Sequence, residues 1–242
     1  MVQRHSDSAS TILLDIEGTT TPIDFVFGVL FPFARDHLDA FFAQQGQQPE
    51  VQADLQQLRQ EYEIDLTQDN ETPSWQGSEP EAAIAYIQHL IAIDRKSTGL
   101  KSLQGKIWEM GYCAGKLRSR LFPDVKPAFQ RWVASGKHLY IFSSGSVPAQ
   151  KLLFRYTEEG DLTPFLSGYF DTRTGPKKET PSYTKIAEGI GVAPSAILFI
   201  SDVTAELKAA KGARLQTLFS MRPGNRSFDA EGFAAIQTFD GV

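Results

Sequence analysis

Three short apolar runs, each stopping at a cluster of polar residues, constrain the fold more than any other feature of this sequence. The runs are residues 11–14 (TILL), 138–142 (HLYIF) and 196–200 (AILFI). Short runs rich in β-branched and aromatic residues are typical of buried strands. Helical patterns follow at residues 147–157 and 203–212, and Gly212 stands where a helix C-cap glycine is expected. Strands that alternate with helices predict an α/β fold with a parallel sheet.

The long stretch between the first two runs has a different character. From about residue 25 to 120 it contains no convincing strand. It contains four helical patterns, at residues 26–45, 51–65, 79–94 and 103–120. An insertion after the first strand is well placed to act as a lid over the strand ends. We therefore predict a catalytic core of residues 1–24 and 121–242, interrupted by a helical cap of residues 25–120.

Composition indicates which kinds of binding partner and which cellular compartment to expect. Hydrophobic residues make up 41% and charged residues 22%, as in ordinary globular proteins, and the net charge is −5 without a long Lys/Arg run. We therefore expect no nucleic-acid partner. Cys113 is the only cysteine, which fits a reducing compartment, and no apolar stretch approaches the ~18 residues of a membrane span. The expectation is a cytoplasmic protein without a membrane partner, and the lack of a heptad pattern favours a monomer.

The first polar cluster offers a pair of carboxylates. Asp15 and Glu17 share one face of an extended segment, and Gly18 then permits a sharp turn. A carboxylate can attack phosphorus and form an aspartyl-phosphate. A second carboxylate can hold a cation or act as an acid and base. D-x-E-G also occurs as a plain turn or helix cap, so the pair is not decisive alone.

Two further clusters suit a phosphate group. Ser143 and Ser144 end the second run just before a helical pattern, where hydroxyls and free backbone N–H groups bind anions, although serines there also serve as N-caps. Lys177 and Lys178 lie in a turn before another helix. One lysine pointing inward would neutralise a transferring phosphoryl group, whereas the alternative is a pair of surface lysines.

The third run leads to a possible metal ligand. Asp202 follows this run, and Glu206 comes four residues later as a possible outer partner. Mg²⁺ prefers oxygen ligands, usually one or two carboxylates with phosphate and water, although Asp202 would also suit a helix cap. All these clusters are expected at the carboxyl ends of parallel strands, where ligands bind. Together they predict a magnesium-dependent phosphatase that acts on a small phosphorylated metabolite.

With these residues assigned, the chain resembles the haloacid dehalogenase-like phosphatases, and within them the enolase-phosphatases of methionine salvage. Glu17 replaces the second aspartate of the usual first motif, as it does in the enolase-phosphatases. The resemblance runs from residue 12 to about residue 225. Its most specific segments are residues 103–108 (LQGKIW), 122–125 (FPDV), 140–147 (YIFSSGSV), 201–204 (SDVT) and 222–225 (RPGN).

The resemblance implies a Rossmann-like parallel sheet with an inserted helical cap, and it implies a role for each candidate residue. Asp15 would be the nucleophile and a Mg²⁺ ligand. Glu17 would be the acid/base residue and bind the metal through its backbone carbonyl, and Asp202 would complete the metal site. The contacts to phosphate would come from Ser143, Ser144 and Lys177, the last of which would neutralise charge.

The implied substrate is 2,3-diketo-5-methylthiopentyl 1-phosphate. Enolisation followed by phosphate release would give 1,2-dihydroxy-3-keto-5-methylthiopentene, the product of an acireductone synthase. Two alternatives stay open at this point. One is another lidded phosphatase of the same superfamily that acts on a sugar phosphate. The other is a phosphoacceptor signalling module, which would place its acceptor after a later strand and would need no large helical lid.

Overall fold

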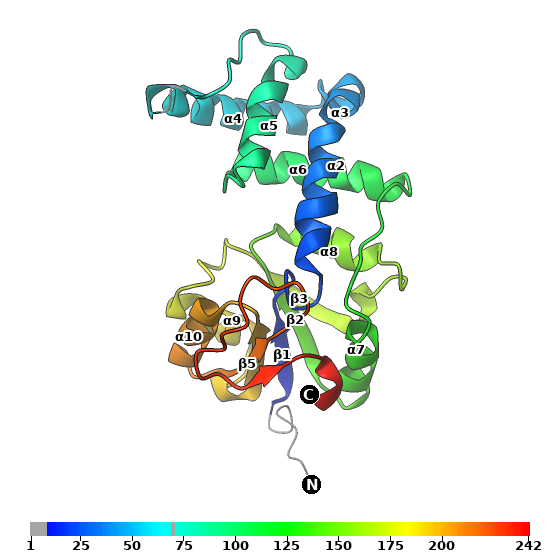
Figure 1. Ribbon diagram of the computed structural model, residues 1–242, viewed down its shortest axis with the longest axis vertical. Coiled ribbons are helices and arrows are strands. Elements are labelled where there is room, and N and C mark those ends of the chain that lie inside the picture. The colour runs from blue at the N-terminus through cyan, green and yellow to red at the C-terminus, as the bar shows by residue number, and fades with distance from the viewer. Residues whose placement is uncertain (1–8, 69–70) are drawn as a thin grey trace. The chain divides into compact units, whose positions relative to one another are not determined.

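The computed structural model describes residues 9–68 and 71–242 (Figure 1). The chain forms two compact units. The first unit combines the residues up to Val26 with Arg118–Val242, and the second unit is Phe27–Leu117.

A six-stranded parallel sheet forms the centre of the first unit. Its strands are β1 (Thr11–Leu14), β2 (His138–Phe142), β3 (Leu166–Phe170), β4 (Ile197–Ser201), β5 (Gln216–Ser220) and β6 (Ala235–Ile236). The strand order is β3-β2-β1-β4-β5-β6, and Leu14 of β1 pairs with Ile141 of β2 and Ile200 of β4. This confirms the predicted α/β fold with a parallel sheet. Successive strands are added on one side of β1 up to β3 and on its other side from β4 onward, so the strand order reverses between β1 and β4. The crevice at such a point is the usual ligand site of open α/β sheets.

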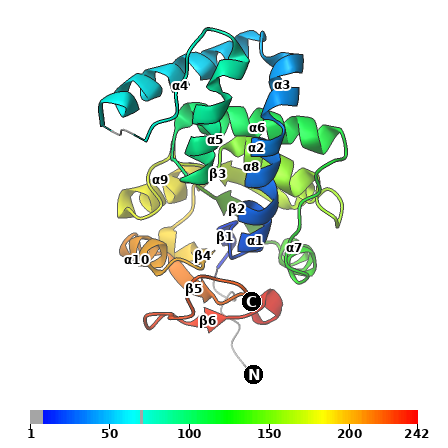
Figure 2. The same cartoon turned by 45° about the horizontal axis from the view of Figure 1, so that its top comes forward.

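Helices cover both faces of this sheet. The helices are α1 (Ile23–Phe25), α7 (Val125–Ala134), α8 (Val147–Arg155), α9 (Thr180–Ile190) and α10 (Thr204–Gly212), with 3-10 turns at Thr163–Phe165, Pro194–Ala196 and Phe239–Gly241. Figure 2 shows α7 on one side of the sheet and α9 and α10 on the other. Ile12 and Leu14 pack into the apolar cluster of α7 and α8, whereas Leu13 packs into that of α9 and α10. Burial on both faces explains why the strand sequences are continuously apolar.

Within the described part of the second unit, every regular element is a helix. It contains a π-helix (Val26–Leu30, which begins at the unit boundary), α2 (Phe31–Asp36), α3 (Leu38–Gln45), α4 (Pro49–Gln68), a 3-10 turn (Pro80–Ala83), α5 (Ile84–Ala92) and α6 (Thr98–Cys113). The helices enclose their own core, in which Phe41, Leu58 and Tyr86 are fully or almost fully buried. The predicted helical character of this stretch is confirmed. Among the helices of the described residues, none combines the length and the apolar character that crossing a membrane requires.

Two predicted helices differ from the observed ones. The helix expected over residues 103–120 ends at Cys113, because Gly115 adopts a left-handed φ of 69°. The amide of Lys116 then donates to the carbonyl of Gly111 at 2.9 Å, which is the hydrogen bond that closes a Schellman C-cap. The helix expected over residues 26–45 is interrupted at His37, which has non-helical backbone angles.

The predicted cap at Gly212 is wrong. Gly212 is the last residue of α10, and the left-handed residue beyond the helix is Arg214, with a φ of 66°. A Cβ atom on Gly212 would lie 2.7 Å from Oγ1 of Thr180, at the start of α9. The glycine is therefore required by the close approach of α9 and α10.

Candidate functional site

Asp15 occupies the carboxyl end of β1, the strand beside the point where the strand order reverses. Its amide continues the sheet by donating to the carbonyl of Ile200 at 3.0 Å. Its side chain is buried, and Oδ1 accepts hydrogen bonds from the amide of Ile16 at 2.7 Å and from Nζ of Lys177 at 2.6 Å. The sheet thus holds a carboxylate in a fixed orientation at the edge where ligands bind.

Lys177 is the cation of this site. The turn before α9 brings it between two carboxylates, Asp15 and Glu206, with Nζ 2.7 Å from Oε2 of Glu206. Burial by itself lowers the pKa of Lys177, but the charges of Asp15 and Glu206 outweigh burial and raise this pKa above its ordinary value. Lys177 therefore stays protonated beside Asp15. Its neighbour Lys178 is exposed, so Lys177 is the member of the pair that points inward.

Two further residues complete the buried cluster. Ser201, the last residue of β4, donates to Oε2 of Glu206 at 3.0 Å and lies 3.5 Å from Oδ2 of Asp15. Glu206 lies in the first turn of α10. The sequence suggested Glu206 as an outer partner only, and Ser201 was missed. The available signal was the position of Ser201 directly after an apolar strand.

Asp202 lies beside the loop that leaves Asp15. Its Oδ2 is 2.2 Å from the point that a Cβ on Gly18 would occupy, so this approach requires glycine, which has a φ of 67° here. Burial and the nearby negative charge of Asp15 raise the pKa of Asp202 to about 8. Two carboxylates that repel each other, as Asp15 and Asp202 do, create a negative potential that favours binding of a cation.

Glu17 lies at the more open side of this group. Its side chain is 39% exposed, and Oε1 is 3.7 Å from Nη2 of Arg226. Its charge also contributes to the raised pKa of Asp202. Within the described residues, no three His, Cys, Asp or Glu side chains form a metal-binding cluster. A cation here would take further oxygens from backbone, water or substrate, as Mg²⁺ commonly does.

Ser143 and Ser144 lie at the end of β2, at the same sheet edge as Asp15. Oγ of Ser143 accepts a hydrogen bond from the amide of Gly145 at 3.2 Å, and Ser144 is exposed. The N-cap of α8 is Ser146, whose Oγ accepts from the amide of Ala149. The two predicted phosphate-binding serines are therefore not the helix cap. Neither is joined by a hydrogen bond to Asp15 in the described structure.

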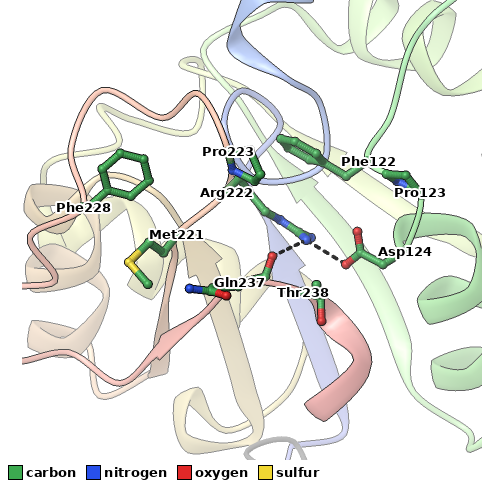
Figure 3. A pocket seen from close by; sticks show the side chains of 9 residues that line it. All are labelled: Phe122, Pro123, Asp124, Met221, Arg222, Pro223, Phe228, Gln237 and Thr238. Atoms are coloured by element: carbon green, nitrogen blue, oxygen red, sulfur yellow. Dashed lines mark hydrogen bonds and ion pairs between the residues drawn. The ribbon is translucent and has the colours of Figure 1, made fainter.

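A separate cavity of about 410 Å³ lies in the first unit (Figure 3). It is lined by Phe122, Pro123, Asp124, Met221, Arg222, Pro223, Phe228, Gln237 and Thr238. Arg222 is buried there and donates to a carboxylate oxygen of Asp124 at 2.8 Å. None of the predicted site residues is in this lining. The candidate site is therefore the cluster at the strand ends.

Comparisons with known proteins identify the family. Residues 9–214 match the haloacid dehalogenase-like hydrolase family. The enolase-phosphatase E1 of Synechococcus elongatus is 60% identical over 233 residues, which cover 96% of this chain and 97% of that protein. The enolase-phosphatase E1 of Pseudomonas fluorescens is 45% identical over 239 residues, which cover 97% of each chain.

Two other similar proteins extend the comparison. The crystal structure of the UTR4 protein of Saccharomyces cerevisiae has a TM-score of 0.77 and 34% identity, over 97% of this chain and 100% of that one. A grapevine (Vitis vinifera) protein is 46% identical over 97% of this chain but only 47% of its own length. It is named a probable bifunctional methylthioribulose-1-phosphate dehydratase/enolase-phosphatase E1. These matches cover nearly the whole chain, so it belongs to the haloacid dehalogenase-like hydrolases and, within them, to the enolase-phosphatase E1 family.

Proposed function

We propose that this chain is a magnesium-dependent enolase-phosphatase of methionine salvage. It converts 2,3-diketo-5-methylthiopentyl 1-phosphate into 1,2-dihydroxy-3-keto-5-methylthiopentene and phosphate. The observation that carries the proposal is the buried carboxylate of Asp15, which has Lys177 at 2.6 Å and the carboxylate of Asp202 nearby. A nucleophile, a fixed positive charge and a cation-attracting carboxylate therefore meet at one sheet edge.

The names of the relatives support the choice of substrate. The grapevine protein joins an enolase-phosphatase to a methylthioribulose-1-phosphate dehydratase, by its name. Loss of water from a ketose 1-phosphate gives a vicinal diketone that still carries its phosphate. Such a diketone is the substrate that we propose here.

The donor set at the strand ends fits Mg²⁺. Asp15 and Asp202 would bind it through carboxylate oxygens, and Glu17 through its backbone carbonyl. The raised pKa of Asp202, about 8, reflects burial and repulsion from Asp15, both of which a divalent cation would offset. When bound, the ion supplies charge neutralisation of the phosphate and stabilisation of the enolate.

Enolisation comes first in the proposed sequence. The phosphate-bearing carbon lies next to a carbonyl, so its proton is acidic. Glu17 removes this proton, the C–H electron pair forms the C=C bond, and the carbonyl oxygen becomes an enolate oxygen that takes a proton from solvent to form the enol. The partly exposed position of Glu17 beside buried Asp15 supports its assignment to the substrate side of the site.

Phosphoryl transfer follows. Asp15 attacks phosphorus, the bond from phosphorus to the C1 oxygen breaks, and the leaving oxygen receives the proton from Glu17. Water activated by Glu17 then cleaves the aspartyl-phosphate, which releases phosphate and restores Asp15. Lys177 neutralises charge throughout, and the hydroxyls of Ser143 and Ser144 contact the phosphate oxygens.

The monomeric state expected from the sequence stays a prediction.

A panel of phosphate esters tests the proposal. The diketone phosphate should exceed sugar phosphates in kcat/KM by at least ~100-fold, because the site must accept a vicinal diketone in its reacting geometry. Rapid acid quench during turnover should trap phosphate covalently bound to the wild-type protein. Asp15→Asn should trap none and release no phosphate. Equal hydrolysis of a sugar phosphate would reject the substrate, and phosphate release by Asp15→Asn would reject the nucleophile.

A further inference from the structure

Asn225 holds the loop that follows the nucleophile. Its side chain is buried, and Nδ2 donates to the carbonyls of Gly18 at 3.0 Å and Ser220 at 2.9 Å. Oγ of Ser220 donates to the same Gly18 carbonyl at 3.1 Å. Two side chains that follow or end β5 therefore fix the position of Gly18, next to Glu17 and three residues from Asp15.

The amide of Asn225 has only one workable orientation. Both of its Nδ2 contacts are carbonyl oxygens, which accept hydrogen bonds and cannot donate them. Flipping the amide would place Oδ1 against two acceptors, so Oδ1 faces away from them. This oxygen is buried and accepts no hydrogen bond from any residue that the structure describes. Buried acceptors are normally satisfied, which points to a donor or a cation outside the protein chain.

The position of Oδ1 indicates what this donor is. Oδ1 of Asn225 lies 3.0 Å, and Oδ2 of Asp202 lies 2.2 Å, from the single point that a Cβ on Gly18 would occupy. Two oxygen acceptors thus converge on the same side of Gly18. One of them is a carboxylate already assigned to the cation. Water molecules bound to a divalent cation are strong hydrogen-bond donors, and Mg²⁺ keeps several of its waters.

We propose that Asn225 is a positioning residue of the cation site, through an oxygen that accepts a hydrogen bond from a water bound to the cation beside Asp202. Its Nδ2 meanwhile holds Gly18, so a single side chain couples the nucleophile loop to the hydrated ion. The inference rests on the proposed magnesium site and adds a residue to it. Outer contacts of this kind orient metal ligands and tune metal affinity.

The test measures cation binding without substrate, by calorimetry with Mg²⁺ and by electron paramagnetic resonance with Mn²⁺. Asn225→Ala should raise the Kd by about 10-fold or more, the usual effect of losing an outer contact. Asn225→Asp keeps an oxygen beside the cation and loses the donor to Gly18. Its Kd should stay within about threefold of wild type or fall. Ser220→Ala is the matched control, because it removes the other hydrogen bond to Gly18 without removing an oxygen near Asp202, and its Kd should change less than about threefold.

Each result decides between the inference and a purely structural role. A Kd within about twofold of wild type for Asn225→Ala would overturn the inference. Equal weakening in Asn225→Ala and Asn225→Asp would also overturn it, because only the Nδ2 contacts would then matter. If Asn225→Ala fails to fold, as thermal melting would reveal, the Kd values of Asn225→Asp and Ser220→Ala are compared with each other. A Kd for Asn225→Asp that is no higher than that for Ser220→Ala supports the inference, and a clearly higher one overturns it. A wild-type protein that binds no Mg²⁺ would instead overturn the proposed magnesium dependence, and the inference with it.

Discussion

The ammonium group of Lys177 lies 2.6 Å from a carboxylate oxygen of Asp15, and each side chain is 7% exposed. The same ammonium group also pairs with Glu206, whose side chain is 8% exposed. The hydroxyl of Tyr183 donates to the backbone carbonyl of Lys177 at 2.6 Å and so fixes the turn that carries it. One buried lysine therefore pairs with two carboxylates, one directly after β1 and the other in the first turn of α10.

Replacing Lys177 by methionine should lower the rate of phosphate release by about 10³-fold, because a preorganised positive charge beside the reacting phosphoryl group is lost. Single-turnover phosphate release measures this rate without interference from product release. Lys178→Met is the control, since that lysine is exposed and the change should leave the rate within about threefold. A Lys177→Met protein that keeps a tenth of the wild-type rate would contradict the assigned role.

The same substitution should also destabilise the fold. Lys177→Met leaves Asp15 and Glu206 buried without their shared cation, which should cost about 3 kcal/mol of unfolding free energy at pH 7. Adding Glu206→Gln removes one of the two stranded charges, so the double variant should be more stable than Lys177→Met alone. Urea unfolding of the wild type, Lys177→Met, Glu206→Gln and the double variant gives the coupling energy. Strictly additive losses would show that Lys177 and Glu206 do not act as a unit.

Glu17→Gln tests whether Glu17 acts in both proposed half-reactions. Loss of the base should slow exchange of the C1 proton of the substrate into D₂O by about 10²- to 10⁴-fold, a rate that NMR follows directly. Arg226→Gln, which removes the cation 3.7 Å from Glu17 but keeps the base, is the companion variant and should retain exchange. Full exchange in Glu17→Gln with lost phosphate release would mean that the enolising base lies elsewhere.

The strands at the centre of the sheet were predictable, and those nearer its edges were not. The sequence predicts β1 and β2 at their observed bounds and β4 within one residue, because burial on both faces makes these strands continuously apolar. In β3 every residue is only partly buried or exposed, and a Cβ atom on its Gly168 would lie 2.9 Å from the ring of Tyr140. β5 begins with partly exposed polar residues, and β6 has two residues. Such segments lack the pattern of a buried strand.

The predictability of the site follows from that of the strands. Asp15, Ser143 and Asp202 are predictable as candidates, because each comes directly after a strand that the sequence reveals. Ser220 and Asn225 are not predictable in this way, because β5 lacks the pattern of a buried strand, although the family resemblance includes the segment that contains Asn225. The selection of Lys177 over Lys178 followed from the family resemblance and not from the residues. The turn that directs Lys177 inward depends on tertiary contacts, including that with Tyr183.

Asp171, which follows the unpredicted strand β3, provides a test of pH dependence away from the cation site. Its carboxylate accepts hydrogen bonds from the amide and Nε of Arg173, and from the amide of Val147 at the start of α8. Burial alone raises the pKa of Asp171, but these hydrogen bonds outweigh burial and lower the pKa below its ordinary value. A lowered carboxyl pKa stabilises the fold above the ordinary value of 3.8, and this stabilisation is lost as the pH falls through the folded-state value.

Asp171→Asn should therefore lower the unfolding free energy at pH 7 by about 1 kcal/mol, the usual loss for a hydrogen-bonded charge. The difference from wild type should shrink as the pH is lowered below about 4, because the carboxyl of the unfolded chain becomes protonated there and that of the folded protein follows at lower pH. Urea titrations between neutral and acidic pH measure this difference in unfolding free energy. Glu188→Gln, on the exposed side of α9, should show no such trend. A difference that stays constant with pH would mean that the charge of Asp171 contributes nothing.

Arg222 links three parts of the first unit. Its guanidinium group donates to the carboxylate of Asp124 and to the carbonyl of Gln237 (Figure 3). Its Nε donates to the carbonyl of Thr19, in the loop after Asp15, at 3.2 Å. The side chain of Arg222 is 2% exposed, and that of Asp124 is 12% exposed. The ion pair is therefore almost completely removed from water. Replacing one of its two residues leaves the charge of the other buried and uncompensated.

Arg222→Met should lower the unfolding free energy by about 3 to 5 kcal/mol, because Asp124 keeps its charge and loses its cation. Arg222→Lys should recover only part of this loss, since an ammonium group cannot replace the planar fork that reaches three acceptors. The guanidinium also lies 4.8 Å and 4.2 Å from the ring centres of Phe122 and Phe239, and methionine preserves apolar contact with both rings. The expected loss thus reports on charge and hydrogen bonding, with packing largely kept. Equal stability of Arg222→Met and wild type in urea would show that this buried pair is replaceable by apolar contact, as it is in some other proteins.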